Sequence, residues 1–325
     1  MPNKKNRLNY DLRIHRIKKI HAAVTVIIAL LVISVSIPLF VSRWNRSGNE
    51  RKELLAYWEA GAFDNIFSAS GTALVSRPMD YFLLTLRGFS AYQLGIAQIN
   101  NQDTLAYINE CIWSLRKALL LKNSQDDGRV YYVLGKAYCY KGNEYADLAV
   151  KYLEKAREVL YKAQDIPEYL GLAYAALRDY RGSVEAFTQA LNPPSYTEGG
   201  DVVAGETAGL SDVLLLSIAR SYMALDESGS ARAYLQRCVE ISRDSNTRVA
   251  ARLLLGEVLG KSGDSGGAEA QYMAALDEAG ENAEARYQLG ELYAAGGDAV
   301  RARAEWRRAV QSDPAHIKAR SRLGM

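Results

Sequence analysis

Residues 283–314 read AEARYQLGELYAAGGDAVRARAEWRRAVQSDP, and residues 249–280, which lie 34 positions earlier, read VAARLLLGEVLGKSGDSGGAEAQYMAALDEAG. In both stretches a Leu-Gly pair is followed at the same spacings by small and bulky apolar residues. Apolar residues recur at i, i+3, i+4 and i+7 on each side of a glycine-containing polar turn, which is typical of two helices in a hairpin. Because a fixed period decides how every other residue is read, these stretches decide the fold of the chain.

The same pattern recurs upstream, where Leu170-Gly171 and Leu134-Gly135 begin similar stretches. We predict that each glycine leaves room for a bulky residue on the second helix of its own hairpin. The predicted pairs are Gly135 with Leu153, Gly171 with Phe187, Gly256 with Tyr272, and Gly290 with Trp306. A hairpin this short cannot bury both of its faces alone, so neighbouring hairpins must stack on one another.

This series resembles the tetratricopeptide repeat (TPR) family, whose repeat is 34 residues long. The resemblance implies an all-α fold, an α-solenoid of about seven helix-turn-helix repeats. A single transmembrane helix is expected to precede the repeats. Clear repeats start at about residues 128, 164, 212, 249 and 283, and two divergent repeats start at about 47 and 81. The final residues, 317–325, are expected to form a partial capping helix.

The transmembrane helix is predicted from residues 22–41, AAVTVIIALLVISVSIPLFV, which contain no charged residue. As a helix this segment would span roughly 30 Å, the thickness of the hydrocarbon core of a bilayer. Basic residues are concentrated before it, so we expect a cytoplasmic N-terminus, a single pass through the inner (cytoplasmic) membrane, and periplasmic repeats. A cleaved signal peptide is the alternative reading of the segment. The opposite topology also stays open, because basic residues follow the segment as well.

These signals divide the chain into seven predicted parts. They are a basic cytoplasmic tail (1–21), a transmembrane helix (22–41), a linker with two divergent repeats (42–127), two clear repeats (128–197), a mobile insert (198–211), three clear repeats (212–316) and a partial capping helix (317–325). The insert belongs to a longer stretch, 192–211, whose sequence NPPSYTEGGDVVAGETAGLS is rich in Gly and Pro, so we expect a loop there. A plain linker and a partner-binding or hinge role are both open for it.

The charge of the chain argues against nucleic acid as a partner. The 325 residues carry 40 Lys and Arg against 37 Asp and Glu, which gives a net charge of +3. Seven of the basic residues lie in the first 21 positions beside a single acidic residue, so residues 22–325 carry 3 − 6 = −3. The body of the protein therefore has no basic excess with which to bind phosphates.

No motif in the sequence predicts catalysis, so we expect no enzymatic activity, no cofactor and no metal site. Residues 263–267 spell GDSGG, which resembles the nucleophile loop of chymotrypsin-like serine proteases, but such a serine needs a histidine and a carboxylate beside it. The three histidines, His15, His21 and His316, lie far from it in the sequence, and the pentapeptide falls in a turn between two repeat helices. The three cysteines form neither a disulfide framework nor a CxxC pair.

In TPR proteins the first helices of successive repeats line a concave groove, which binds an extended or helical segment of a partner protein. In the N-terminal half of this chain the register places aromatic side chains and two cations on that face. The predicted groove residues are Phe82, Phe89, Tyr92, Arg129, Tyr132, Lys136, Tyr140, Tyr169 and Leu172.

Towards the C-terminus the same face is more mixed and more acidic, with Arg220, Met223, Glu257, Tyr287 and Glu291 among its residues. We therefore expect the N-terminal half to bind, because tyrosine rings dominate binding hot spots. Packing of these rings between helices is the alternative.

The resemblance and the apolar segment together predict a membrane-anchored scaffold that binds a protein or peptide partner through its groove. Such a scaffold would assist the assembly of a bacterial cell-envelope machine, for example a secretion, pilus, flagellar or wall-synthesis assembly. The alternative is a chaperone-like holdase for exported polypeptides, which the aromatic groove would also suit. The identity of the partner and the oligomeric state do not follow from the sequence.

Overall fold

The computed structural model describes residues 48–121, 127–191, 194–196, 202–204 and 211–325. The described residues belong to two compact units, and the boundary between the units lies between Pro78 and Met79. In the described part of the first unit, residues 48–59 are helical and α2 (Phe63–Ser76) follows them after a short turn. Gly61 takes a positive φ of 66° in that turn, a conformation that glycine adopts without strain. Leu54 and Ile66 are buried between the two helices, and Arg77 forms an ion pair with Glu50 at 2.6 Å.

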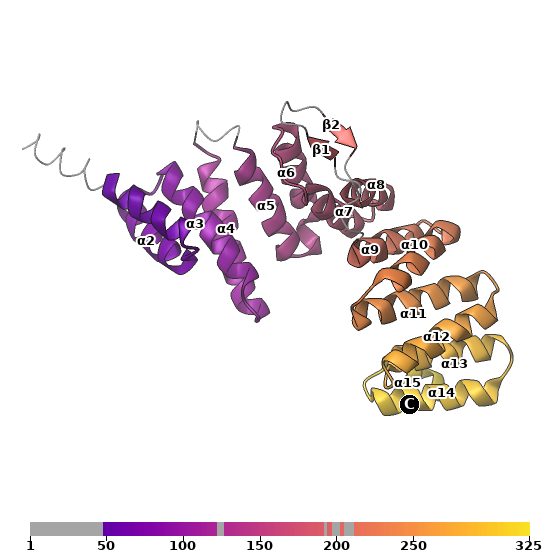
Figure 1. The fold of residues 1–325 in the computed structure, drawn as a ribbon. Helices are drawn as coiled ribbons and strands as arrows, with labels where there is room; N and C mark the ends of the chain where they lie inside the picture. Colours follow the sequence, from indigo (N-terminus) through magenta and orange to yellow (C-terminus); the bar gives the residue numbers. More distant parts are fainter. Residues whose placement is uncertain (1–47, 122–126, 192–193, 197–201, 205–210) are drawn as a thin grey trace, which may run out of the picture. The chain divides into compact units, whose positions relative to one another are not determined.

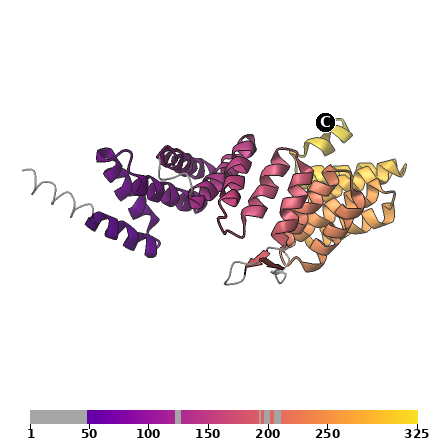
Figure 2. The same ribbon diagram turned by 90° about the horizontal axis from the view of Figure 1, so that it is seen from above.

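The second unit is a series of helix hairpins, which follow the colour order of the chain in Figures 1 and 2. The hairpins are α3 (Tyr81–Ile96) with α4 (Asn101–Ala118), α5 (Gly128–Lys141) with α6 (Ala146–Glu158), α7 (Ile166–Ala176) with α8 (Tyr180–Leu191), α9 (Asp212–Ala224) with α10 (Ser228–Ile241), α11 (Ser245–Lys261) with α12 (Ser265–Glu278), and α13 (Ala283–Ala295) with α14 (Ala299–Ser312). A 3₁₀ turn, η2 (Asn143–Tyr145), precedes α6, and α15 (Ile317–Leu323) follows α14. The second helix of each hairpin packs on the first helix of the next, and successive first helices also contact one another. The prediction of an all-α solenoid of TPR-like repeats is confirmed.

Five of the six hairpins close where a glycine of the first helix faces a bulky residue of the second, and in the α9–α10 hairpin Ala219 stands at the position of the glycine. A Cβ atom on Gly171 would lie 2.5 Å from the ring of Phe187, and one on Gly256 would lie 2.5 Å from the ring of Tyr272, so no larger residue fits without displacing the partner helix. Gly290 faces Trp306 in the same way. The remaining two sockets are Gly88 with Leu115 and Gly135 with Leu153. The predicted glycine pairs are therefore confirmed, and Gly88 adds one that the sequence analysis did not name.

Polar residues at the turns begin the helices. Asp264 accepts a hydrogen bond from the backbone N–H of Gly267 at 2.9 Å and thereby caps α12. Gly263 takes a φ of 86° just before it. The GDSGG sequence is thus a helix-capping turn, and Ser265 is the first residue of α12. Asp298 caps α14 through the N–H of Arg301 in the same manner.

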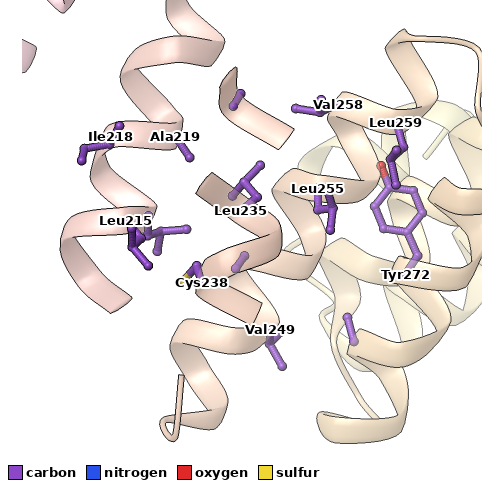
Figure 3. Packing of buried hydrophobic residues seen from close by; sticks show 14 of the residues in the cluster. Leu215, Ile218, Ala219, Leu235, Cys238, Val249, Leu255, Val258, Leu259 and Tyr272 are labelled. Carbon is purple, nitrogen blue, oxygen red and sulfur yellow. The ribbon is translucent and has the colours of Figure 1, made fainter. Parts of the chain in front are cut away.

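The largest core of the second unit lies between α8 and α13 (Figure 3). Leu215 and Ala219 on α9 lie on the side of that helix towards Leu235 and Cys238 of α10, and Leu255 on α11 continues the apolar layer. Cys238 is fully buried in this layer, where it serves as a small apolar residue. Stacking of successive hairpins therefore buries an apolar core from α8 to α13, and a separate cluster that includes Leu153, Ile166 and Leu170 lies between α6, α7 and α8.

The stretch between α8 and α9 differs from the loop that the sequence predicts. Residues Pro194–Tyr196 (β1) pair antiparallel with Val202–Ala204 (β2), with Ser195 opposite Val203. Adjacent β-branched valines favour an extended strand, and this preference outweighs the Gly and Pro content on which the prediction of a loop rested. The rest of the predicted mobile insert, 197–201 and 205–210, lies outside the described residues. Across this insertion α8 still packs on α9, and the buried hydroxyls of Ser183 and Ser221 lie 3.0 Å apart in a hydrogen bond.

Within the described ranges, no helix combines the length and the apolar character that a crossing of the membrane demands. The predicted transmembrane helix, 22–41, and the predicted basic tail, 1–21, lie outside those ranges.

Candidate functional site

Five of the nine predicted groove residues lie together on the first helices α3, α5 and α7. Tyr92 comes from α3, Tyr132, Lys136 and Tyr140 come from α5, and Tyr169 comes from α7. The three residues of α5 are spaced four apart and therefore share one face of that helix. Because α3 and α7 each contact α5, the rings of three successive hairpins meet around one lysine. We call these five residues the tyrosine cluster.

Lys136 is the centre of the cluster. Its ammonium nitrogen lies 4.5 Å from the ring centroid of Tyr169, 4.9 Å from that of Tyr132 and 5.7 Å from that of Tyr92. The same nitrogen donates a hydrogen bond to the hydroxyl of Tyr132 at 2.9 Å and forms an ion pair with Asp165 at 2.8 Å. Only 13% of the lysine side chain is exposed. The cation is thus held by ring faces and one carboxylate, an arrangement that fixes the rings around it.

Asp165 binds two residues of the cluster and was not among the predicted groove residues. It lies just before α7, and its carboxylate accepts hydrogen bonds from the hydroxyl of Tyr132 at 2.7 and 2.8 Å. A second residue that the sequence analysis missed is Tyr161, whose ring centroid lies 5.3 Å from that of Tyr132. The sequence does carry a signal at Asp165, because an acidic residue directly before a helix with proline in its first turn is typical of a helix cap. In the structure, however, the Asp165 side chain makes no capping hydrogen bond and binds Tyr132 and Lys136 instead.

Burial shifts the ionisation of the cluster. Burial and the hydrogen bond to Asp165 together raise the pKa of Tyr132 to about 12, against the opposing effect of Lys136. Burial alone would lower the pKa of Lys136, but its bonds to Asp165 and Tyr132 outweigh burial and raise it. Burial and the nearby charge of Asp165 raise the pKa of Glu168 above its ordinary value. At neutral pH Lys136 is therefore charged and Tyr132 is not.

The other three rings also interact with one another. Tyr92 and Tyr140 meet edge to face, with centroids 5.9 Å apart. Burial raises the pKa of Tyr169, and the neighbouring Tyr140 raises it further. Tyr140 is 42% exposed, and its hydroxyl group can both donate and accept a hydrogen bond. Tyr140 is thus the part of the cluster that a partner can reach.

The remaining four predicted groove residues lie outside the cluster. Phe89 is only 8% exposed on α3 and offers little surface to a partner, and Phe82 is half-buried on the same helix. Arg129 is exposed in the first turn of α5. Leu172 is 44% exposed on α7, three residues beyond Tyr169 and so on the same side of that helix.

The corresponding face of α13 has a different character, because α15 lies against its side chains. Glu291 binds Arg322 of α15 at 2.9 and 2.5 Å. Glu284 lies 3.1 Å from Nε2 of His316, while Nδ1 of the same ring accepts a hydrogen bond from the N–H of Ala319 and caps α15. The ring of Tyr287, between the two glutamates, lies 5.3 Å from that of His316. Acidic and aromatic residues of α13 are thus already engaged with the chain itself.

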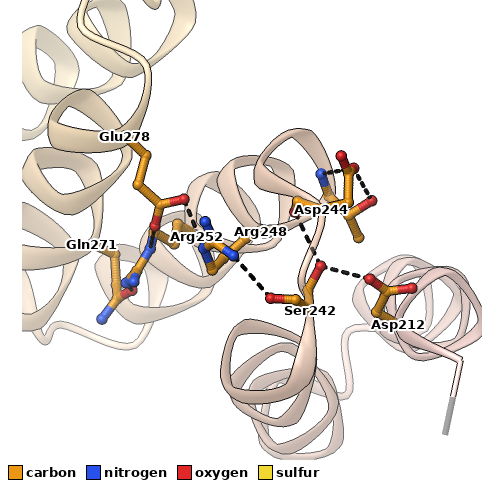
Figure 4. A network of polar contacts seen from close by, with 8 residues as sticks. Asp212, Ser242, Asp244, Arg248, Arg252, Gln271 and Glu278 are labelled. Carbon is orange, nitrogen blue, oxygen red and sulfur yellow. Dashed lines mark hydrogen bonds and ion pairs between the residues drawn. The ribbon is translucent and has the colours of Figure 1, made fainter. Parts of the chain in front are cut away.

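Ion pairs also dominate the neighbouring hairpin (Figure 4). Arg248 and Arg252 on α11 both reach Glu278 on α12, at 2.7 and 2.9 Å. Although burial opposes it, this pairing lowers the pKa of Glu278 below its ordinary value. The network continues through the hydroxyl of Ser242, which donates to the carboxylate of Asp212 at 2.6 Å.

The described residues offer little for other chemistry. Among them, no group of His, Cys, Asp and Glu side chains could hold a metal ion. The half-buried thiol of Cys139 lies beside the tyrosine cluster and faces the carbonyl of Tyr169 at 3.9 Å. Burial raises the pKa of this thiol to about 12, which removes the thiolate that a reactive cysteine needs.

Comparison with known proteins supports the fold. Residues 214–245, which comprise most of α9 and α10, match the sequence model of the tetratricopeptide repeat. No curated protein matches the chain in sequence.

Several solved structures are similar in fold. The C-terminal part of a TPR repeat-containing protein from Cytophaga hutchinsonii is similar over 84% of this chain and 99% of its own, at 13% identity and a TM-score of 0.58. PilW, described as a widely conserved type IV pilus biogenesis factor, is similar over 73% of this chain and 98% of its own, at 18% identity and a TM-score of 0.54. The protein pilF of Pseudomonas aeruginosa is similar over 73% of this chain and 96% of its own, at 15% identity and a TM-score of 0.50. The chain therefore carries a tetratricopeptide repeat at residues 214–245 and folds as an all-α solenoid of TPR-like helix pairs.

Proposed function

We propose that this protein is a scaffold that binds a protein or peptide partner through the face formed by α3, α5 and α7. The observation that carries the proposal is the tyrosine cluster, in which rings from three successive hairpins are fixed around Lys136. Rigid aromatic side chains supply contact area at a small cost in side-chain entropy, and they dominate the binding energy of many interfaces. The binding surface comprises the exposed parts of the cluster together with its neighbours Arg129 and Leu172.

We further propose that residues 22–41 anchor the scaffold in the inner membrane. The proposal rests on a run of twenty residues without charge and on the basic residues that precede it. By the positive-inside rule the N-terminus lies in the cytoplasm and the repeats lie in the periplasm. The partner is then a protein of the periplasm or of the membrane surface.

The scaffold is proposed to assist the assembly of a cell-envelope machine. An anchor that holds a protein-binding solenoid at the membrane suits this role. Two proteins of similar fold, PilW and pilF of Pseudomonas aeruginosa, add support, because PilW is described as a pilus biogenesis factor.

In-cell crosslinking of the tagged full-length chain, followed by mass spectrometry, tests the proposal. A Tyr132→Ala/Tyr169→Ala variant removes two rings of the cluster, and an Arg220→Ala/Glu257→Ala variant alters the same face on α9 and α11 as a matched control. We expect one dominant partner that is lost in the first variant and retained in the second. Circular dichroism must show that both variants keep their helix content.

Two outcomes would contradict the proposal in different ways. A partner that persists in the tyrosine variant would show that the binding face lies elsewhere. Many weak clients without a dominant partner would favour the holdase instead.

A further inference from the structure

The charges beside the tyrosine cluster balance one another. Lys136 is paired with Asp165 and is largely shielded by three rings. Of the two other charged residues on this face, Arg129 is exposed at the start of α5, and Glu168 is half-buried near Asp165. Two cations therefore stand beside two carboxylates. A charged partner would gain little from this face, because the one central cation is already neutralised.

What the cluster presents to solvent is mainly part of Tyr140, a ring that carries a hydroxyl group. Tyr140 is 42% exposed. Leu172 is 44% exposed on α7 and adds apolar surface beyond Tyr169. Such a surface combines an aromatic ring with a hydroxyl group that can donate a hydrogen bond.

We propose, on the basis of the function proposed above, that the partner segment is uncharged, extended and proline-containing, and that it stacks on Tyr140 while one of its backbone carbonyls accepts the Tyr140 hydroxyl. A polyproline II segment has no internal hydrogen bonds, so all of its carbonyls are free to accept. Its conformation is set before binding, and aromatic surfaces recognise proline rings by stacking. Lys136 and Asp165 are positioning residues here, because they hold the rings without reaching the segment.

The first argument for this partner is the charge balance, and the second is the contrast with α13. There, Glu284 and Glu291 engage Lys318 and Arg322 of α15 and His316, which directly precedes that helix. That face shows what this fold uses to hold a basic segment, namely carboxylates at intervals along the first helix. On α5 two cations, Arg129 and Lys136, and two tyrosines, Tyr132 and Tyr140, occupy the corresponding face instead, so a basic segment is disfavoured.

Fluorescence anisotropy with the purified full-length chain tests the inference. The probe is a fluorescein-labelled peptide of Pro and Ala with two Leu residues. Three matched peptides replace its prolines by Ser, two of its alanines by Glu, or two of its alanines by Lys. Each is measured against the unaltered chain, Tyr140→Phe, Lys136→Met and the control Arg220→Ala.

We expect the proline peptide to bind more tightly than the three others. Its affinity should change by less than about twofold between roughly 0.05 and 0.5 M NaCl, because no exposed ion pair is formed. Tyr140→Phe should weaken binding about threefold, as the loss of one hydrogen bond predicts, while keeping the ring. Lys136→Met should weaken it further because the rings lose their fixed positions, and Arg220→Ala should have no effect.

Three outcomes would overturn the inference. The first is a Glu or Lys peptide that binds more tightly than the proline peptide, with strong salt dependence. The second is proline-peptide binding that Tyr140→Phe leaves unchanged. The third is the absence of binding by the proline peptide. None of these outcomes decides the proposed function, because a crosslinked partner lost in the Tyr132→Ala/Tyr169→Ala variant would still establish the face as a binding site.

Discussion

The face formed by α3, α5 and α7 and the face formed by α11 and α13 are built on the same hairpin, yet their chemistry is opposite. In the N-terminal half, rings enclose one lysine and leave Tyr140 exposed. In the C-terminal half, arginines and glutamates pair with each other, and α15 engages Glu284 and Glu291. Both halves use the same glycine sockets to close their hairpins. The repeat thus fixes the backbone, while the variable positions of the first helix decide what the surface can bind.

The largest expected effect comes from a substitution in the apolar core that joins the two halves. Phe187 is fully buried on α8, where it fills the socket at Gly171 and joins the core that extends to α13. Phe187→Ala should lower the free energy of unfolding by about 3–5 kcal/mol, because it leaves a cavity in a packed core. Urea denaturation followed by circular dichroism measures it. The control, Leu177→Ala, truncates a residue that is 45% exposed and should change stability little. An equal effect of both variants would contradict this account of the core.

The next effect distinguishes the ion pair enclosed by tyrosine rings in the N-terminal half from a more exposed ion pair in the C-terminal half. Asp165→Ala leaves Lys136 without its carboxylate beneath the tyrosine rings. We expect a loss of about 1–2 kcal/mol, which is less than for a fully buried pair because Asp165 is partly exposed. Glu291→Ala breaks the more exposed pair with Arg322 and should cost at most about 1 kcal/mol.

Chemical denaturation of both variants makes this comparison. The double variant Lys136→Met/Asp165→Ala should recover part of the loss, because it removes the unpaired cation. Equal costs for Asp165→Ala and Glu291→Ala would show that the lysine is less well enclosed than its ring contacts indicate.

The two halves should also respond to opposite extremes of pH. The pKa of Tyr132 is raised in the folded state to about 12, so its contribution to stability is present below the unfolded value of about 10 and is lost as pH rises towards 12. The pKa of Glu278 is lowered, so its contribution is present above the unfolded value of about 4.3 and is lost as pH falls through the lower folded value.

Hydrogen exchange read by mass spectrometry at several pH values, corrected for the intrinsic exchange rate, resolves the two halves. Alkali should weaken protection first in α5 and α7, and acid should weaken it first in α11 and α12. Glu278→Gln should remove much of the difference in acid, whereas Glu281→Gln, at an exposed position, should not. Simultaneous opening of both halves at either extreme would contradict the prediction.

The smallest expected effect concerns a tyrosine–glutamate hydrogen bond between repeats, which is present in both halves. The hydroxyl of Tyr174 on α7 donates to Glu154 of the preceding hairpin at 3.0 Å, and that of Tyr293 on α13 donates to Glu269 at 2.6 Å. Each tyrosine stands three residues after the glycine of its Leu-Gly pair. Tyr174→Phe and Tyr293→Phe should each cost about 0.5–1.5 kcal/mol in thermal unfolding, because one hydrogen bond is lost. A clear difference between them would show that these inter-repeat bonds are not equivalent.

The sequence predicts the scaffold better than the site. The scaffold depends on residues at regular spacings, whereas the site also depends on a contact between residues that no regular spacing relates. The glycine sockets follow from a fixed period, and Tyr132, Lys136 and Tyr140 follow from their spacing on one helix. The pairing of Lys136 with Asp165 depends on how the chain enters α7, and no periodicity records that. The β1–β2 pairing escaped prediction because a strand of three residues is too short to show an alternating pattern beside the surrounding Gly and Pro.

The contact between α8 and α9 has a practical consequence for engineering. Ser183 and Ser221 bond to each other across the boundary between two hairpins, although residues 192–211 separate the helices in sequence. The entropy of closing a loop rises only slowly with its length, at about 0.6 kcal/mol for each doubling. The stretch between α8 and α9 is therefore a site where an epitope or a fluorescent domain can be grafted while the helices on either side keep their contact.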